Sequence, residues 1–298
     1  MTQSQTAREF ETISWTVDRD GVATLLLDRP DQLNAFSVTM ARELTEFFEV
    51  HAHSDDIRAV VVTGSGRAFC AGMDLTGEGN VFGLDESIEP PTPEEFAAHY
   101  TEPPFQDGVR DTGGKLTLAI YALPKPVIAA INGPAVGIGA TMTLAMDTRL
   151  ASTAARIGFV FGRLGIVMEA CSSWFLPRIV GPAQALEWVY SAEIIDAEAA
   201  HAGRLVRSVH EPDELVGAAQ ELARSWVRGR SAVGVAINKQ LIYRGLGAAT
   251  PLEQHLADSL GMYYTSIGDG KEGVAAFLEK RAPEFTSRAS EVPRIVAD

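Results

Sequence analysis

Several features that mark large classes of protein are scarce in this chain of 298 residues. It has two cysteines, Cys70 and Cys171, which suit a reducing cytoplasm better than an extracellular fold held by disulfide bonds. It has no run of the roughly 18 to 20 apolar residues that cross a membrane. Residues 1–15 are polar and lack the apolar segment of a secretion signal. We therefore expect a cytoplasmic protein with no membrane partner.

Positive charge is scarce as well. The chain has 25 Lys and Arg against 39 Asp and Glu, a formal net charge of −14. Nucleic-acid binding requires a basic face, so we expect no nucleic-acid partner. A small ligand that carries phosphate is still compatible, because a few basic side chains and backbone N–H groups can hold it. The six histidines, which include His51 and His53, show no zinc-binding spacing, and we expect no metal site.

The chain does contain a repeating order of apolar strands, glycine turns and helices. Residues 14–30 predict two strands joined at Asp20-Gly21. Residues 37–54 predict an amphipathic helix capped by Ser37. The apolar residues 57–64 predict a buried strand, and residues 125–147 predict a further strand, a glycine turn and a helix from about Gly137. After about residue 180 the pattern is mainly helical, so the sequence predicts an α/β protein with a helical C-terminal region.

One segment, residues 76–108, interrupts this order. It is acidic and contains five prolines, at positions 90, 91, 93, 103 and 104. We favour a surface insertion or mobile loop, and the alternative is a lid that shapes a substrate pocket. Its acids Glu78, Asp85 and Glu86 are candidates for a second catalytic group.

Two glycine turns follow apolar strands, at residues 68–75 ("AFCAGMDL") and 132–141 ("NGPAVGIGAT"). The start of a helix leaves backbone N–H groups without partners, and two such groups from neighbouring turns can form an oxyanion hole. Glycine turns are nevertheless common in α/β proteins, and most have no chemical role. The second turn lacks the GxGxxG spacing of dinucleotide sites, and Ser65 lacks the flanking glycines of a hydrolase nucleophile.

Five segments occur in order between about residue 13 and residue 285: "LDRPDQLNAF", "AVVVTGSGRAFCAGMDL", "KPVIAAINGPAVGIGATMTLAMDTRLAS", "GRLGIVMEACSSWFLPRIVG" and "KEGVAAFLEKR". Together they resemble the crotonase superfamily of enoyl-CoA hydratases and isomerases. The resemblance implies a ββα-spiral, acyl-CoA-binding core over residues 1–210 and a C-terminal helical trimerisation region over residues 211–298. It also implies a homotrimer or hexamer. Coenzyme A would enter only as the substrate thioester, with no other cofactor.

The resemblance also implies a set of site residues. The thioester oxygen would accept hydrogen bonds from the backbone N–H groups of Met73 and Ile138. Many relatives have glycine where Ile138 stands, so its branched side chain should narrow that wall. Lys280 falls where relatives reach the CoA phosphates, sometimes across a subunit boundary, and the alternative is a solvated lysine. The other implied residues are Arg29 and Leu33 for CoA, and Ala71, Asp74, Leu75, Gly137, Thr141, Phe161 and Trp174 for substrate.

The reaction is indicated by which acids are present. Hydratases of the family use two glutamates to orient water and to protonate the α-carbon. In this chain those positions correspond to Thr141 and Phe161, neither of which can act as an acid or base near neutral pH. Instead, Glu169 in "MEACSSWF" resembles the single catalytic acid of peroxisomal-type Δ3,Δ2-enoyl-CoA isomerases. Other members of the superfamily place an aspartate near this point for dehalogenation or for carbon–carbon bond hydrolysis.

An acid among apolar residues is either paired or shifted in pKa. Glu169 could pair with Arg163 or Arg178, and the alternative is a catalytic carboxylate whose pKa is raised by neighbours such as Val167, Met168 and Trp174. One carboxyl group can move a proton from C2 to C4 of an enoyl thioester. The rival functions are an enoyl-CoA hydratase or acyl-CoA hydrolase in which Glu169 orients water or attacks as a nucleophile, and a non-catalytic acyl-CoA-binding or RNA-binding relative.

Overall fold

The main sheet has six strands in the order β1-β2-β3-β4-β6-β9. The computed structural model describes residues 10–76, 79–293 and 295. The β1 and β2 strands are antiparallel and joined at the predicted turn, where Gly21 has φ +78°. The other neighbours are parallel. The strands are β1 (Ile13–Val17), β2 (Val22–Leu27), β3 (Ala59–Gly64), β4 (Val127–Ile131), β6 (Thr148–Ser152) and β9 (Ser208–His210).

A smaller sheet of three strands begins with residues of the second glycine turn. It has the order β5-β7-β8, with β5 parallel to β7 and β8 antiparallel to β7. An isolated bridge between Cys70 and Ala135 joins this sheet to the first glycine turn. The two turns of interest are therefore held side by side by backbone pairing. The strands are β5 (Pro134–Val136), β7 (Arg156–Gly158) and β8 (Ile194–Asp196).

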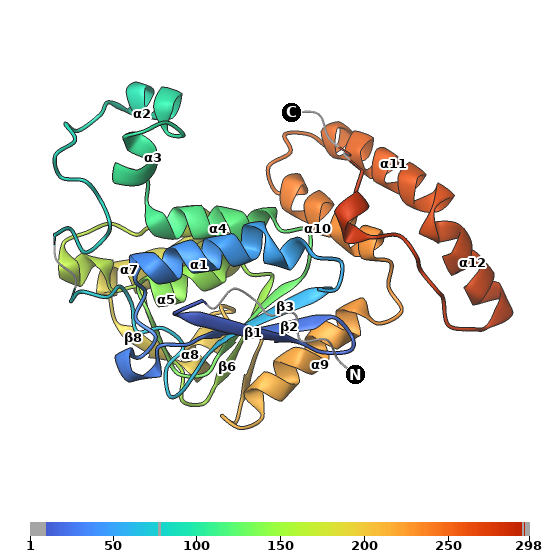
Figure 1. Cartoon of the computed structure of the whole chain (residues 1–298), viewed down its shortest axis with the longest axis horizontal. Coiled ribbons are helices and arrows are strands. Elements are labelled where there is room, and N and C mark those ends of the chain that lie inside the picture. Colours follow the sequence, from blue (N-terminus) through green and yellow to red (C-terminus); the bar gives the residue numbers. More distant parts are fainter. Residues whose placement is uncertain (1–9, 77–78, 294, 296–298) are drawn as a thin grey trace.

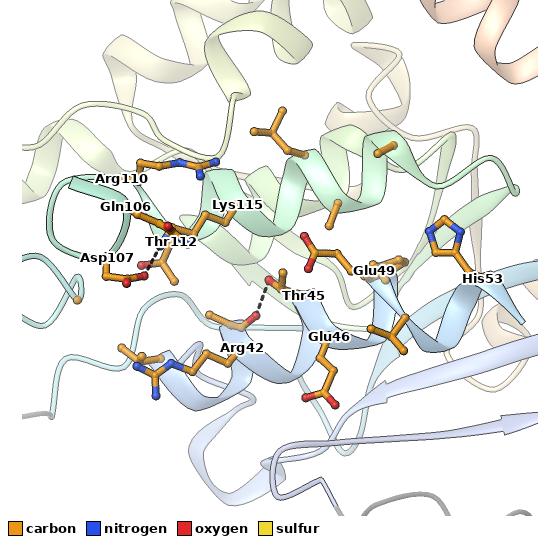
Figure 2. Close-up of a pocket in the computed structure, with 18 residues that line it drawn as sticks. Arg42, Thr45, Glu46, Glu49, His53, Gln106, Asp107, Arg110, Thr112 and Lys115 are labelled. Atoms are coloured by element: carbon orange, nitrogen blue, oxygen red, sulfur yellow. Dashed lines mark hydrogen bonds and ion pairs between the residues drawn. The ribbon is translucent and has the colours of Figure 1, made fainter. Parts of the chain in front are cut away.

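Helices α1 (Val38–Glu49) and α4 (Thr112–Ala122) lie side by side on one face of the main sheet (Figure 1). Ser37 caps α1 as predicted, since its hydroxyl accepts the N–H of Met40 at 3.1 Å. Leu44, Phe47 and Phe48 of α1 enter the large apolar core between these helices and the strands. The outer groove between α1 and α4 holds a cavity of about 750 Å³ lined by many charged side chains (Figure 2).

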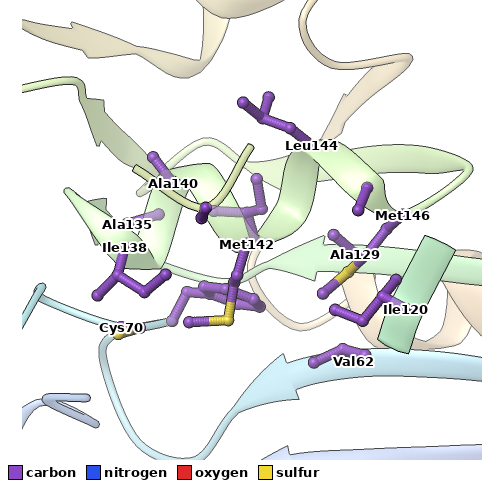
Figure 3. Packing of buried hydrophobic residues seen from close by; sticks show 14 of the residues in the cluster. Val62, Cys70, Ile120, Ala129, Ala135, Ile138, Ala140, Met142, Leu144 and Met146 are labelled. Carbon is purple, nitrogen blue, oxygen red and sulfur yellow. The ribbon is translucent and has the colours of Figure 1, made fainter. Parts of the chain in front are cut away.

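The helix predicted from about Gly137 is shorter than expected. It consists of α5 (Ile138–Thr141) and a 3₁₀ turn, Met142–Ala145, because Met146 is extended and leads into β6. Figure 3 shows Ile138 and Met142 on the side of this segment near the turn that carries Cys70. The segment is thus buried against the first glycine turn. The remaining helices of the core are α6 (Ser172–Val180), α7 (Pro182–Ser191) and α8 (Ala197–Ala202). The short helices α2 (Pro93–His99) and α3 (Phe105–Gly108) of the proline-rich segment lie apart from the core (Figure 1).

Helix α9 (Leu215–Val227) covers the other face of the main sheet. Its buried side chains, Leu215, Ala219, Ala223 and Val227, pack against β2, β3, β4 and β6. The predicted division at residue 210 assigned α9 to the C-terminal region. By packing, α9 belongs with the core, because it completes the second layer over the sheet.

Three helices then project from the core (Figure 1): α10 (Ala232–Gly245), α11 (Pro251–Ile267) and α12 (Asp269–Glu279). Lys239 and Tyr243 of α10 anchor them, since both donate to the carboxylate of Asp147, at 3.1 and 3.0 Å. The structure confirms the predicted α/β class with C-terminal helices, and trimerisation stays a prediction. None of the helices in the described residues is long and apolar enough to span a membrane. Apolar side chains exposed on α11 and α12 include Leu252, Leu256, Leu260, Met262, Tyr263, Ile267, Phe277 and Leu278.

Candidate active site

A cavity of about 700 Å³ lies where the two glycine turns meet the start of α4 and the loop before α6. Met73 from the first turn, Ile138 from the second and Glu169 from the loop all line it. Most of the remaining wall is apolar. A largely apolar cavity with a few convergent polar groups is the usual form of a small-molecule site.

The two turns approach each other through backbone hydrogen bonds. Cys70 N–H donates to the carbonyl of Pro134 at 3.0 Å, and Val136 N–H donates to the carbonyl of Cys70 at 3.0 Å. Gly139 permits this approach, because a Cβ there would lie 2.0 Å from the Cys70 oxygen. Gly137, with φ +55°, is the N-cap residue directly before α5, and glycine accommodates this left-handed conformation at the cavity wall.

Neither the Met73 nor the Ile138 N–H group donates to a protein acceptor within the described residues. The bonds on either side of Met73 are made: Phe36 N–H donates to Gly72, and Asp74 N–H donates to Phe36. Ile138 is the first residue of α5, where N–H groups have no intrahelical acceptor. Two unused amide donors therefore belong to residues in the wall of one cavity, as an oxyanion hole requires.

The Glu169 side chain occupies the same cavity and is only partly accessible. The Thr141 hydroxyl donates to its Oε1 atom at 2.5 Å. Its Oε2 atom lies against α4 at Gly113, where a Cβ would come within 2.3 Å of that oxygen. No arginine or lysine in the described part of the chain forms an ion pair with Glu169. Arg178, one suggested partner, stacks instead over the Trp174 ring at 4.0 Å.

Burial raises the pKa of Glu169 to about 8. The negative charge of Asp111 acts in the same direction, and the hydrogen bond from Thr141 acts against both. The predicted direction is therefore right. Of the three predicted neighbours, only Val167 lines the cavity. Val167 is 83% exposed, and Trp174 packs against Tyr121 and Phe175 rather than in the cavity.

Asp111 is a site residue that the sequence analysis missed. It lines the cavity and caps α4, accepting the N–H of Gly113 at 3.0 Å. Its other oxygen accepts the N–H of Ala170 at 2.7 Å. This bond holds Asp111 close to Glu169, because Ala170 follows Glu169 in the chain. An aspartate before "TGGK" is a recognisable capping signal. The contact with Ala170 is tertiary, and no local pattern indicates it.

Comparison with known proteins identifies the family. The model of the enoyl-CoA hydratase/isomerase family matches residues 18–288. The chain belongs to this family. An enoyl-CoA hydratase of Alternaria alternata is 39% identical over 90% of this chain and 84% of its own length. The protein is thus an acyl-CoA-processing enzyme of the crotonase superfamily, of hydratase/isomerase type.

Solved structures agree with the family assignment and with the fold. A putative enoyl-CoA hydratase from Streptomyces coelicolor A3(2) matches with a TM-score of 0.80 and 28% identity, over 97% of this chain and 98% of that one. A monofunctional enoyl CoA isomerase from M. smegmatis matches with a TM-score of 0.64 and 28% identity, over 82% of this chain and 97% of that one. Hydratases and isomerases of the family thus share this architecture.

The structure brings together only part of the residue set that the family resemblance implied. Asp74 lies outside the cavity lining because it pairs with Arg29 at 2.9 Å. Thr141 is fully buried behind Glu169 and is not a wall residue. The Trp174 ring packs against Tyr121 of α4 and stacks with Arg178 of its own helix, α6. The implied residues that do line the cavity are Ala71, Met73, Leu75, Gly137, Ile138, Phe161 and Glu169.

The implied CoA-binding residues do not line the cavity either. Arg29 donates to the carbonyl of Ala35 and to Asp74, and the carbonyl of Leu33 accepts the N–H of Ala71 at 3.1 Å. Both residues therefore brace the first glycine turn. Lys280 is exposed at the end of α12, at the opposite end of the molecule from α7 (Figure 1). A role for Lys280 at the site of another subunit stays a prediction.

The proline-rich segment shapes the cavity of this family member. Phe82 and Leu84 of the segment, together with Val109 directly after it, contribute apolar wall. The described part of the segment lies at the surface, as expected, and also helps to form the cavity. Its acids point elsewhere: Asp85 accepts hydrogen bonds from Ser87, and Glu86 accepts one from Asn80. Glu78 lies outside the described residues.

Proposed function

We propose that this enzyme is a Δ3,Δ2-enoyl-CoA isomerase in which Glu169 is the only proton carrier. The observation that carries the proposal is the position of Glu169, in one cavity with two unused amide donors and without a cationic partner in the described residues. The positions of the two hydratase glutamates hold Thr141, which is buried behind Glu169, and Phe161, an apolar wall residue.

The chemistry follows from this arrangement. The C2–H bond breaks, its proton passes to Oε2 of Glu169, and the electron pair spreads over C2, C4 and the thioester oxygen as a dienolate. The N–H groups of Met73 and Ile138 stabilise the negative charge on that oxygen. The Oε2–H bond then breaks and the proton is added at C4, which leaves the double bond between C2 and C3. A base with a pKa of about 8 is better suited to remove a carbon-bound proton than an ordinary carboxylate.

The comparisons support the coarser assignment more strongly than the finer one. The M. smegmatis isomerase supports isomerisation on this fold, whereas most of the similar proteins are named as hydratases. We also propose that the enzyme assembles through the apolar face of α11 and α12, and that coenzyme A takes part only as the substrate thioester.

Hydration is the second candidate, and one observation favours it. Asp111 is a second carboxylate in the lining of the same cavity, and hydration calls for two groups that handle water and a proton. However, both Asp111 oxygens already accept backbone N–H groups, from Gly113 and Ala170. This second role would require at least one oxygen to hold water in addition to its backbone donor.

Three substrates tested in D₂O separate the candidates. A 3-enoyl-CoA should give the 2-enoyl-CoA with the hydrogen taken from C2 largely retained at C4, because one carboxyl group carries it between the two carbons. A 2-enoyl-CoA should give no 3-hydroxyacyl-CoA. A saturated acyl-CoA should release no free CoA thiol. Formation of 3-hydroxyacyl-CoA as the main product would establish the hydratase instead, and thiol release would establish a hydrolase.

A further inference from the structure

The Thr141 hydroxyl lies between two acceptors. It is 2.5 Å from Oε1 of Glu169 and 3.2 Å from the carbonyl oxygen of Gly137. Thr141 is fully buried, so no solvent competes for this group. A hydroxyl has one proton and can donate to only one of the two oxygens at a time.

The second acceptor belongs to the proposed oxyanion hole. The carbonyl of Gly137 and the N–H of Ile138 are the two ends of one planar peptide group. That carbonyl already accepts the N–H groups of Ala140 at 2.9 Å and Thr141 at 3.0 Å. A further hydrogen bond from the hydroxyl adds to the polarisation of the peptide and makes its N–H a stronger donor. The single proton on Thr141 is thus shared between the base and the opposite end of an oxyanion donor.

We propose that Thr141 is a positioning residue that couples the protonation of Glu169 to the donor strength of the Ile138 amide. The proposal rests on the proposed function, because both groups must act on one bound thioester. While Glu169 is charged, its carboxylate is the stronger acceptor and receives the hydroxyl proton. Once Oε2 has taken the proton from C2, Oε1 becomes a weaker acceptor and the hydroxyl turns to Gly137. The Ile138 N–H is then strongest while the dienolate oxygen carries its charge.

Other titratable groups face Glu169 and must be distinguished from this effect. Asp111 from the start of α4 and Arg163 from the 3₁₀ turn Phe161–Leu164 line the same cavity. Cys70 and Cys171 are nearby thiols, and burial raises the pKa of both, that of Cys70 to about 12. These groups are the same in the wild type and in variants at Thr141. The coupling therefore predicts a change in the carbonyl band that requires both the Thr141 hydroxyl and a change in the protonation of Glu169.

The test uses a saturated acyl-CoA labelled with ¹³C at the thioester carbon, which binds without being isomerised. Isotope-edited infrared spectra of the complex report how strongly the oxyanion hole polarises the carbonyl. They are measured at about pH 6 and about pH 9.5, on either side of the Glu169 pKa of about 8. The variants are Thr141→Val, which removes the hydroxyl, and Thr141→Ser, which keeps it. Thr143→Val is the matched control, because Thr143 is also buried and donates to a carbonyl, that of Ala140.

At the lower pH, the carbonyl band of Thr141→Val should lie at higher frequency than that of the wild type. At the higher pH the two bands should coincide, because the wild-type hydroxyl then donates to Glu169. Thr141→Ser should follow the wild type, as should Thr143→Val. Equal bands at both pH values, or the same displacement at both, would overturn the coupling, since a purely structural role displaces both equally.

Kinetics give a second measurement. Isomerase turnover should fall about tenfold in Thr141→Val, and serine should restore most of it. The pH midpoint of kcat/KM should also move upward in Thr141→Val, because the charged form of Glu169 loses a donor. If the wild type turns over no 3-enoyl-CoA but the bands differ only at low pH, the proposed function fails and the coupling stands. If the wild type does turn over the 3-enoyl-CoA but the bands show no difference confined to low pH, the coupling fails and the proposed function stands.

Discussion

The two cavities of this protein have similar volumes, about 700 and about 750 Å³, but different walls. The groove between α1 and α4 carries many charged groups, including Arg42, Glu49, Asp107 and Lys115, with Lys115 and Asp107 paired at 3.2 Å (Figure 2). The site cavity has few, and Glu169 is held there without a cationic partner in the described residues. Under the proposed function, reactivity depends on an acid without a cationic partner beside two unused amides, and not on the number of charged groups in a cavity.

The largest expected effect comes from replacing one acid in each cavity, Glu169 in the site cavity and Glu49 in the groove between α1 and α4. Glu169→Gln should lower kcat at least about 1,000-fold, because the proton carrier is lost. Affinity for a saturated acyl-CoA should change little. Glu49→Gln, an exposed position in the other groove, is the control and should keep wild-type turnover. Steady-state kinetics and calorimetry check both. Full activity in Glu169→Gln would contradict the proposed role of Glu169 and, with it, the functional difference between the two cavities.

A single methyl group should disturb the site through α4. In Gly113→Ala the new Cβ would lie 2.3 Å from Oε2 of Glu169 and 2.6 Å from Cδ1 of Ile138, so both must shift. Misplacement of a catalytic group by about 1 Å can lower the rate about 100-fold, which is the loss of kcat expected here.

Gly217→Ala is the matched control for Gly113→Ala. Gly217 lies in α9, where a Cβ meets nothing within 4 Å. Its activity should be unchanged, with a gain of about 0.5 to 1 kcal/mol in the free energy of unfolding. Equal activity in the two variants would mean that Glu169 is not confined as described.

The raised pKa of Glu169 should make the free energy of unfolding depend on pH. Its pKa is raised from 4.5 in the unfolded chain to about 8 in the folded protein. Between these values the folded state keeps a proton that the unfolded state has lost, so stability falls as pH rises, by up to about 1.4 kcal/mol per pH unit. This loss is absent below about pH 4.5 and complete above about pH 8.

Glu169→Gln should therefore become progressively more stable than the wild type across this window. Urea unfolding of both proteins at a series of pH values measures the difference. A stability difference that does not change with pH would show that Glu169 titrates like an exposed acid. Glu49→Gln supplies the exposed reference from the other groove.

The smallest expected effect concerns the second acid of the site. Asp111→Asn removes a negative charge that raises the pKa of Glu169, so the midpoint of the kcat/KM profile should move from about 8 to lower pH, by about half a unit to one unit. Asp107→Asn, in the other groove, should leave the midpoint unchanged. A fall in kcat of several hundredfold with an unmoved midpoint would indicate instead that Asp111 handles a proton directly, as hydration needs.

Much of this site could be predicted from sequence because its parts are local. The turns that carry Met73 and Ile138, and the cap of α1 at Ser37, depend on residues close in the chain. The contacts that complete the site are not local. Thr141 meets Glu169 across the fold, and Asp111 meets Ala170 in the same way.

Two further contacts that the sequence does not indicate have the same origin. Trp174 is close to Glu169 in the chain, but helix α6 turns its ring toward Tyr121 and away from the cavity. Helix α9 follows the predicted boundary at residue 210, yet its apolar face packs on the main sheet. Periodicity predicts that a helix has an apolar face, and only the tertiary structure shows which element covers it.

A crystal structure with a bound, unreactive acyl-CoA tests the central claim most directly. The account predicts the thioester oxygen within hydrogen-bonding distance of the N–H groups of Met73 and Ile138. It also predicts Oε2 of Glu169 about 3 to 3.5 Å from C2, a reactive separation. A thioester oxygen away from both amides, or Asp111 in place of Glu169 as the carboxylate nearest C2, would contradict it.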